Sequence, residues 1–402
     1  MAPRYLIIVL AWAALCSGLV LPAVAPEIAN TVSIAAMVLA MPLCCVEGGW
    51  SIFRQSSIAL PLVGGLLLAI AFLITAKSVL HVAAIFYFGP LYLAGPLALL
   101  LARLNLRDLP GCIGIAALAG TLAALAVALY DSVVLDLSRA GGSVANPIHF
   151  ADITLLLGFT ALIGIFGASR WRAVFSAGPV LAVIVVILSG SRGALVAAIP
   201  MSVIAIALMT FWFLPPRRRP FVLLAGVVAV IVVAAAIFVA GLLPRFAVLW
   251  SSVANLLAGG EVDSSTMQRV VMYEAAYNTF RASPIFGHGL IDFIRTTSQY
   301  VPKGIKFPFY DHLHSDLADF AVVGGLIGLL TYSLFIAAPA LGGIRAASVH
   351  RRAAILLGSM TSMGYLIMGL SNAMFGILTL TVLYGTSLAL VALLARTGTA
   401  RD

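Results

Sequence analysis

The residues best suited to chemistry stand together just before an apolar run long enough to cross a membrane. They are Asp311, His312, His314 and Asp316. Ionisable groups beside a membrane span are costly to hold in place, so such a cluster indicates a functional site. Because an imidazole titrates near neutral pH, a histidine here could accept the proton of a hydroxyl group.

Two other interpretations of this cluster stay open. Its side chains could bind zinc, but a tight site needs three or four converging ligands, and residues two apart on a helix point in different directions. A histidine could also serve only to cap the helix that follows. The residues alone favour a general base over a metal site and leave the choice of histidine open.

A short polar turn separates two apolar runs at Ser189-Gly190-Ser191-Arg192-Gly193. Ser191 can cap the next helix, whose N-terminus carries free N–H groups and the positive end of the helix dipole. Arg192 adds a planar fork of donors that matches phosphate oxygens. The turn thus predicts a phosphate or diphosphate site, although an arginine at a membrane edge can be merely solvated. Ser191 is not expected to be a nucleophile, because no Gly-x-Ser-x-Gly motif surrounds it.

A polar segment further along is predicted to form an amphipathic helix near residues 265–282. Ser265 and Gln268 have the spacing of a capping box at its start, and Pro284 limits its end. Arg269 and Tyr273 lie one turn apart on one face of this helix. Arg269 is therefore a second candidate for binding an anion, supported by Tyr273, although a lone arginine on an exposed helix is usually solvated.

Composition places the chain among membrane proteins. Of its 402 residues, 62% are hydrophobic and 9% are charged, and the mean hydropathy is +1.13, whereas roughly a quarter of a soluble protein is charged. We expect an all-α polytopic membrane protein that forms a single integral domain over residues 1–402. Because a span needs about 20 apolar residues, the apolar runs predict twelve, near 5–22, 28–46, 58–76, 79–101, 110–130, 151–168, 173–189, 193–214, 221–243, 320–341, 353–372 and 375–395.

The charge distribution gives these spans an orientation. The net charge is +9, but the basic residues lie mainly in short loops, so a nucleic-acid partner is not expected. Most of the 23 lysines and arginines fall on one side when both termini are placed in the cytoplasm. The extracytoplasmic side then holds a long loop at 244–319 and all three candidate sites. Ala23-Val24-Ala25 before Pro26 leaves cleavage of the first span as an alternative.

Taken together, these motifs resemble the O-antigen ligase and polymerase superfamily over residues 189–330. The resemblance is carried by Ser-Arg-Gly at 191–193, Arg269, Pro-x-x-Gly-x-Gly at 284–289, His-x-His-Ser at 312–315, and Gly325 and Gly328. The superfamily usually has His-Asn where this chain has His314-Ser315, which leaves the role of Ser315 open. The His-Leu-His form is more similar to the ligases than to the polymerases.

The resemblance implies a membrane glycosyltransferase of the GT-C type that needs no cofactor and no metal. It would move an O-antigen glycan from undecaprenyl diphosphate to a sugar of lipid A–core, at the periplasmic face of the bacterial inner membrane, in lipopolysaccharide assembly. It assigns Arg192 and Arg269 to the diphosphate and His314 to the acceptor hydroxyl, with direct displacement and inversion at the anomeric carbon. The candidates for supporting roles are Ser191, Tyr273, Asp311, His312 and Asp316.

Other functions are compatible with the sequence. An O-antigen polymerase or a protein O-oligosaccharyltransferase of the same superfamily would carry the same motifs, which do not specify the acceptor. A secondary transporter could also have twelve spans, but it would place ionisable residues near the middle of the bilayer. Asp, Glu and Lys are nearly absent from the middle of the predicted spans, which disfavours transport.

Overall fold

The computed structural model describes residues 2–46, 49–239, 264–301, 307 and 310–396, and all regular secondary structure in these segments is helical. This confirms the expected all-α class. Much of the predicted loop at 244–319 falls on residues 244–263, 302–306 and 308–309, which lie outside the described residues.

Nine helical segments of the described chain are long and apolar enough to cross a membrane. They are Pro26–Cys45, Ser56–Thr75, Val79–Ala102, Leu109–Val134, Pro147–Phe166, Arg172–Ser189, Arg192–Phe213, Asp316–Ile344 and Leu378–Ala395. The other three predicted spans coincide with helices that are not among these nine, namely α1 (Ala2–Leu19), α11 (Arg219–Val239) and α16 (Arg351–Gly369). A multi-pass membrane protein is therefore supported, and the number twelve stays a prediction.

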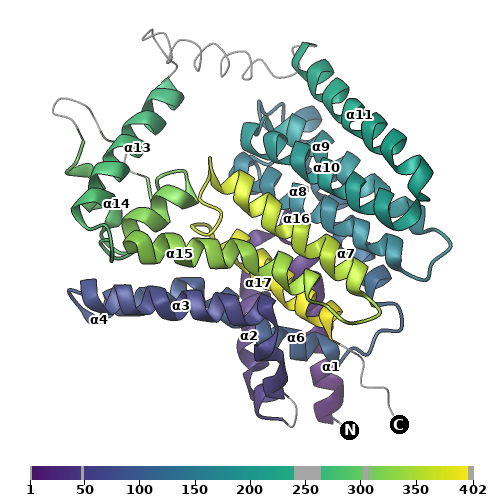
Figure 1. The fold of residues 1–402 in the computed structure, drawn as a ribbon, viewed down its shortest axis with the longest axis horizontal. Helices are drawn as coiled ribbons and strands as arrows, with labels where there is room; N and C mark the ends of the chain where they lie inside the picture. Colours follow the sequence, from purple (N-terminus) through teal and green to yellow (C-terminus); the bar gives the residue numbers. More distant parts are fainter. Residues whose placement is uncertain (1, 47–48, 240–263, 302–306, 308–309, 397–402) are drawn as a thin grey trace.

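The long helix α15 (Asp316–Ile344) lies between α3 (Ser56–Thr75) and α16, and it also contacts α17 (Leu378–Ala395) (Figure 1). Small residues allow this close packing, as is common between membrane helices. A Cβ atom at Gly64 of α3 would come within 2.9 Å of the Phe335 ring. The hydroxyl of Thr331 on α15 donates a hydrogen bond to the Gly64 carbonyl at 3.0 Å.

The other helices surround this centre or extend from it. They are α2 (Pro26–Leu39), α4 (Val79–Ala83), α5 (Gly89–Tyr92), α6 (Ala94–Ala102), α7 (Leu109–Leu129), α8 (Pro147–Ala161), α9 (Ala177–Ser189), α10 (Arg192–Phe213), α13 (Ser264–Ala282) and α14 (Phe293–Ser298). Of these, α13 occupies the segment for which the sequence predicts the loop helix, and it packs against α14 and α15 (Figure 1). Its buried side chains include Val271, Met272, Ala275 and Ala276, so one face of α13 is apolar and covered.

The helix α15 is broken at Gly325, where φ is 60° and ψ is −142°. Its break is filled by the turn that follows α13. The N–H groups of His288 and Gly289 donate to the carbonyls of Val322 and Val323, both at 2.9 Å. In a continuous helix those carbonyls would accept from the residues four positions later.

Those later residues are Leu326 and Ile327, and their N–H groups donate instead to Pro284 at 2.7 Å and Ile285 at 3.3 Å. The inserted turn thus satisfies all four backbone groups that the break would leave without partners. Glycine is needed at the contact, because a Cβ atom at Gly287 or Gly325 would meet backbone atoms at 2.5 to 2.7 Å. The Pro-x-x-Gly-x-Gly motif therefore has a structural role.

Candidate functional site

The candidate residues meet around the turn at 370–377, which connects α16 to α17. The N-terminus of α10 touches it, because a Cβ atom at Gly193 would lie 2.6 Å from the Ser371 hydroxyl. From α8, Asp152 accepts a hydrogen bond from the Asn372 side chain at 2.7 Å. From α15, Asp316 accepts one from the Phe375 N–H at 3.1 Å. The turn thus brings together helices that are far apart in sequence.

The histidine loop, residues 310–315, is held in place by neighbouring side chains. The carboxylate of Asp319, one turn into α15, accepts a hydrogen bond from the Leu313 N–H at 2.8 Å, and the Leu313 side chain is completely buried. The Tyr273 hydroxyl donates to the His314 carbonyl at 3.1 Å. His314 itself has φ 54°, a left-handed conformation that is uncommon for residues other than glycine and often occurs at functional sites.

The two imidazoles of the loop lie close together and are partly buried. The ring centroids of His312 and His314 are 4.5 Å apart, and the Tyr310 ring lies edge-on to His314 at 4.9 Å. Both ring nitrogens of His312 and Nδ1 of His314 are buried and have no hydrogen-bond partner within the described part of the chain. Buried polar atoms normally have partners, so these nitrogens are suited to bonding a ligand hydroxyl.

Burial lowers the pKa of His314 to about 4, with further contributions from His312 and from the positive charge of Arg269. Burial, followed by the neighbouring His149, likewise lowers the pKa of His312 to about 4. Both imidazoles are therefore neutral near pH 7 and each has a lone pair available to accept a proton. Because the charge of Arg269 lowers the pKa of His314, the candidate base and the candidate anion-binding residue interact electrostatically.

His149 is a third histidine in this environment, and sequence reasoning missed it. It lies in the first turn of α8 and interacts electrostatically with both His312 and His314. Its only signal in the sequence is a lone histidine after Asn146 and Pro147, which is equally typical of an ordinary helix start. We find no group of three or more potential ligands arranged to hold a metal ion in the described segments.

Arg269 and Tyr273 lie one turn apart on α13 and are both half-buried. Tyr273 also approaches the turn, with its hydroxyl 3.5 Å from the Leu370 carbonyl. Burial raises the pKa of Tyr273, so it remains a neutral donor at all relevant pH values. Its hydroxyl holds the His314 backbone in position, and Arg269 stays a candidate for binding an anion.

The Ser189–Gly193 turn has the predicted position but not all of the predicted bonds. Ser191 stands at the N-cap of α10, yet its side chain makes no capping hydrogen bond, so this expectation was wrong. The turn is held instead by Ser189, whose hydroxyl accepts from the Ser191 N–H at 3.2 Å and whose carbonyl accepts from Arg139 Nε at 2.8 Å. Arg139 thus lies beside the Arg192 turn, a proximity that its place in a distant loop did not reveal.

The two aspartates of the opening cluster have different surroundings. Asp316 is buried and its carboxylate holds the Phe375 backbone, which indicates a structural role. Asp311 is exposed at the surface of the histidine loop. The buried Ser315 precedes α15 at its N-cap position but makes no capping hydrogen bond through its side chain.

Residues 177–333 match a protein-family model described as O-Antigen ligase. The resemblance to the O-antigen ligase and polymerase superfamily is confirmed for this segment. The O-antigen ligase segment contains Arg192, Arg269 and His314, and it begins and ends close to the limits expected from the motifs. His149 and the 370–377 turn lie outside it, although both contribute to the site. No curated protein matches the chain.

Proposed function

We propose that the protein is a membrane glycosyltransferase that moves an O-antigen glycan from undecaprenyl diphosphate to a sugar of lipid A–core. The family match supports O-antigen ligase- or polymerase-type transfer in general. The His-Leu-His form at 312–314 favours the ligase reaction within that class. The site would face the periplasm from the bacterial inner membrane, with both termini in the cytoplasm, as the charge distribution predicts.

In this mechanism the acceptor oxygen attacks the anomeric carbon of the donor while the bond from that carbon to the diphosphate oxygen breaks. His314 takes the proton of the acceptor hydroxyl as the new glycosidic bond forms. The bonding electrons leave with the undecaprenyl diphosphate, and the configuration at the anomeric carbon inverts. His312 lies close enough to His314 to influence its orientation and its affinity for a proton.

Arg192 and Arg269 would bind the diphosphate and stabilise the charge that grows on it as it leaves. Because a diphosphate is a good leaving group, two guanidinium groups could supply this stabilisation. The bound diphosphate would also oppose the effect of Arg269 on His314. The pKa of His314 should therefore rise when the donor binds, which strengthens the base at the stage when it is needed.

The observation that carries this proposal is the arrangement of His314. Its backbone is fixed by Tyr273 on the same helix as Arg269, and its imidazole is neutral, partly buried and sensitive to the Arg269 charge. This arrangement supports a role for His314 as the base and for Arg269 in binding the diphosphate, both within the segment 177–333.

An in vitro transfer assay tests the proposal. The purified protein is given an undecaprenyl-diphosphate glycan together with lipid A–core, with a second donor molecule or with a pilin-like protein in parallel reactions. We expect transfer to lipid A–core only. Chain extension of the donor would instead show a polymerase, and modification of the protein would show an oligosaccharyltransferase.

A further inference from the structure

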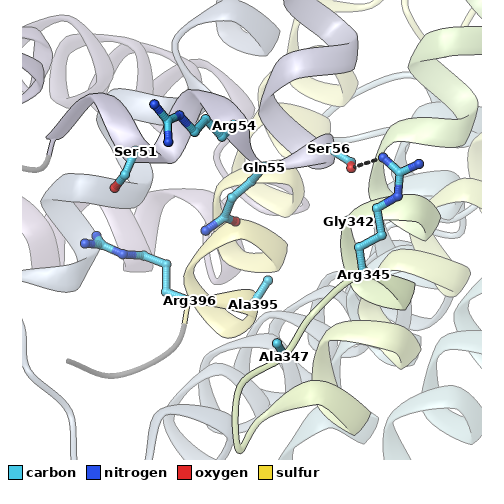
Figure 2. A pocket seen from close by; sticks show the side chains of 9 residues that line it. All are labelled: Ser51, Arg54, Gln55, Ser56, Gly342, Arg345, Ala347, Ala395 and Arg396. Carbon is cyan, nitrogen blue, oxygen red and sulfur yellow. Dashed lines mark hydrogen bonds between the residues drawn. The ribbon is translucent and has the colours of Figure 1, made fainter. Parts of the chain in front are cut away.

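A polar cavity lies at the opposite end of α3 and α15 from the histidine loop. Its volume is about 490 Å³, and its walls include Arg54, Arg345 and Arg396 together with Gln55 and Ser56. Arg54 ends a short 3₁₀ helix at Gly49–Arg54, Arg345 follows α15, and Arg396 follows α17. Figure 2 shows Arg54 and Arg396 on one side, Arg345 on the other, and Gln55 between them.

The charge of this cavity is uncompensated among the described residues. None of the described side chains that line it is acidic. Arg345 donates a hydrogen bond to the Ser56 hydroxyl at 2.9 Å, whereas the side chains of Arg54 and Arg396 have no hydrogen bond or ion pair within the described chain. All three arginines lie at or just after a helix C-terminus, where a cation is favoured, but this does not explain why the three surround one cavity. Three like charges around one cavity repel each other, and an anion would relieve that repulsion.

The position of the cavity indicates where such an anion would come from. The cavity lies where three membrane-spanning helices end, at Ser56, Ile344 and Ala395. Large apolar side chains next to it are exposed, including Trp50 at 68% and Ile344 at 52%. Exposed tryptophan is typical of the headgroup level of a bilayer, and basic pockets between membrane helices bind anionic lipid headgroups.

We propose that the Arg54–Arg345–Arg396 cavity binds a phosphate group, and that this group is the headgroup phosphate of an anionic membrane lipid. The guanidinium groups of Arg54 and Arg396 bind its oxygens from one side and Arg345 binds from the other, with geometry that suits phosphate. By the charge distribution this is the cytoplasmic face. The site is therefore separate from the proposed transfer reaction and does not depend on it.

The test measures lipid binding by the full chain in nanodiscs of phosphatidylcholine that contain a small fraction of phosphatidylglycerol. Bound phosphatidylglycerol is counted by native mass spectrometry. The variant Arg54→Gln/Arg396→Gln changes the two arginines whose side chains make no bond to the described chain, so folding should be preserved. We expect its affinity for phosphatidylglycerol to fall by about tenfold or more, since each arginine near an anionic surface contributes measurably.

The matched control is Arg351→Gln/Arg352→Gln, which removes the same charge from two exposed residues at the start of α16. It should bind phosphatidylglycerol like the unchanged protein. Equal losses in both variants, or none in either, would overturn the proposal. In a separate arm inorganic phosphate is added to nanodiscs of phosphatidylcholine alone. One result would show that the ligand is a soluble anion and not a lipid. In it, the unchanged protein binds inorganic phosphate, the cavity variant does not, and the first arm shows no preference for phosphatidylglycerol.

Discussion

At the scale of single residues, the candidate base of the site is one histidine in an unusual environment. His314 combines a left-handed backbone, a carbonyl held by Tyr273 and an imidazole made less basic by burial and by Arg269. The sequence marks His314, Arg192 and Arg269 as candidates through their motifs. It could not indicate His149 or Arg139, because their relevance depends on contacts between distant segments.

We expect His314→Asn to reduce kcat by at least about a hundredfold, the usual contribution of a general base. Asparagine tolerates positive φ, so this variant keeps the loop conformation that alanine would strain. His288→Asn is a useful control, because the His288 ring bonds to the Thr279 carbonyl. A His314→Asn protein with normal expression and unchanged kcat would rule out the base assignment.

The pH dependence follows from the lowered pKa of His314. The value of kcat/KM, which reports the free enzyme, should fall only as pH approaches about 4. With an unperturbed histidine it would fall near pH 6.5. If the bound diphosphate raises this pKa, the acidic limb of kcat should lie at higher pH than that of kcat/KM. Pre-steady-state and steady-state transfer rates across pH 4 to 8 provide the measurement; coincident limbs would contradict the predicted coupling to the donor.

The same shift affects stability. The folded pKa lies below the unfolded value, so the folded state binds fewer protons than the unfolded state between them. The His314 and His312 contributions to stability are therefore complete above about pH 6.5 and are lost progressively as pH falls toward 4. Thermal unfolding in detergent should show a smaller acid-dependent loss for His312→Gln than for the unchanged protein.

Arg192→Lys should lower kcat/KM by about tenfold or more, because lysine keeps the charge but loses the planar fork of donors. Arg295→Lys, an exposed arginine on α14, is the matched control and should have little effect. Equal activities of the two variants would indicate that Arg192 does not bind the diphosphate.

At the scale of elements, most helices could be predicted because long apolar runs have few alternatives in a bilayer. A helix also occupies Ser264–Ala282, close to the predicted 265–282, and it ends before Pro284 as expected. The break in α15 could not be predicted, since Gly324-Gly325 within an apolar run is also typical of a place where two membrane helices pack closely. Its backbone hydrogen bonds to 284–289 are a tertiary feature with no local periodicity.

Gly325→Ala should destabilise the protein by about 2 kcal/mol or more, because non-glycine residues are strained at this φ and ψ and the new Cβ atom would lie 2.6 Å from the Ile285 carbonyl carbon. Gly89→Ala is the control, since a Cβ atom there meets nothing within 4 Å. The measurement is the midpoint of thermal unfolding for both variants in one detergent. Similar midpoints would show that the break can adapt to a side chain.

At the scale of the whole molecule, the site is assembled by the 370–377 turn rather than by any one motif. Residues from α8, α10, α13 and α15 all approach this turn. The role of this turn cannot be seen from the family match or from the motifs, because the turn follows the last residue of each. The polar groups of the site and the arginine cavity lie at opposite ends of α3 and α15, so one pair of helices connects the two.

The inserted turn at 284–289 also limits how the protein can be recombined with its relatives. Its four backbone hydrogen bonds join the loop helix α13 to the two halves of α15. A chimeric protein could take only the segment with α13 and the turn from a relative, or only α15 and the helices after it. Its 284–289 turn and its break at Gly325 would then come from different proteins and would not fit each other. Exchanges meant to alter acceptor choice should therefore transfer residues 264–328 as one block.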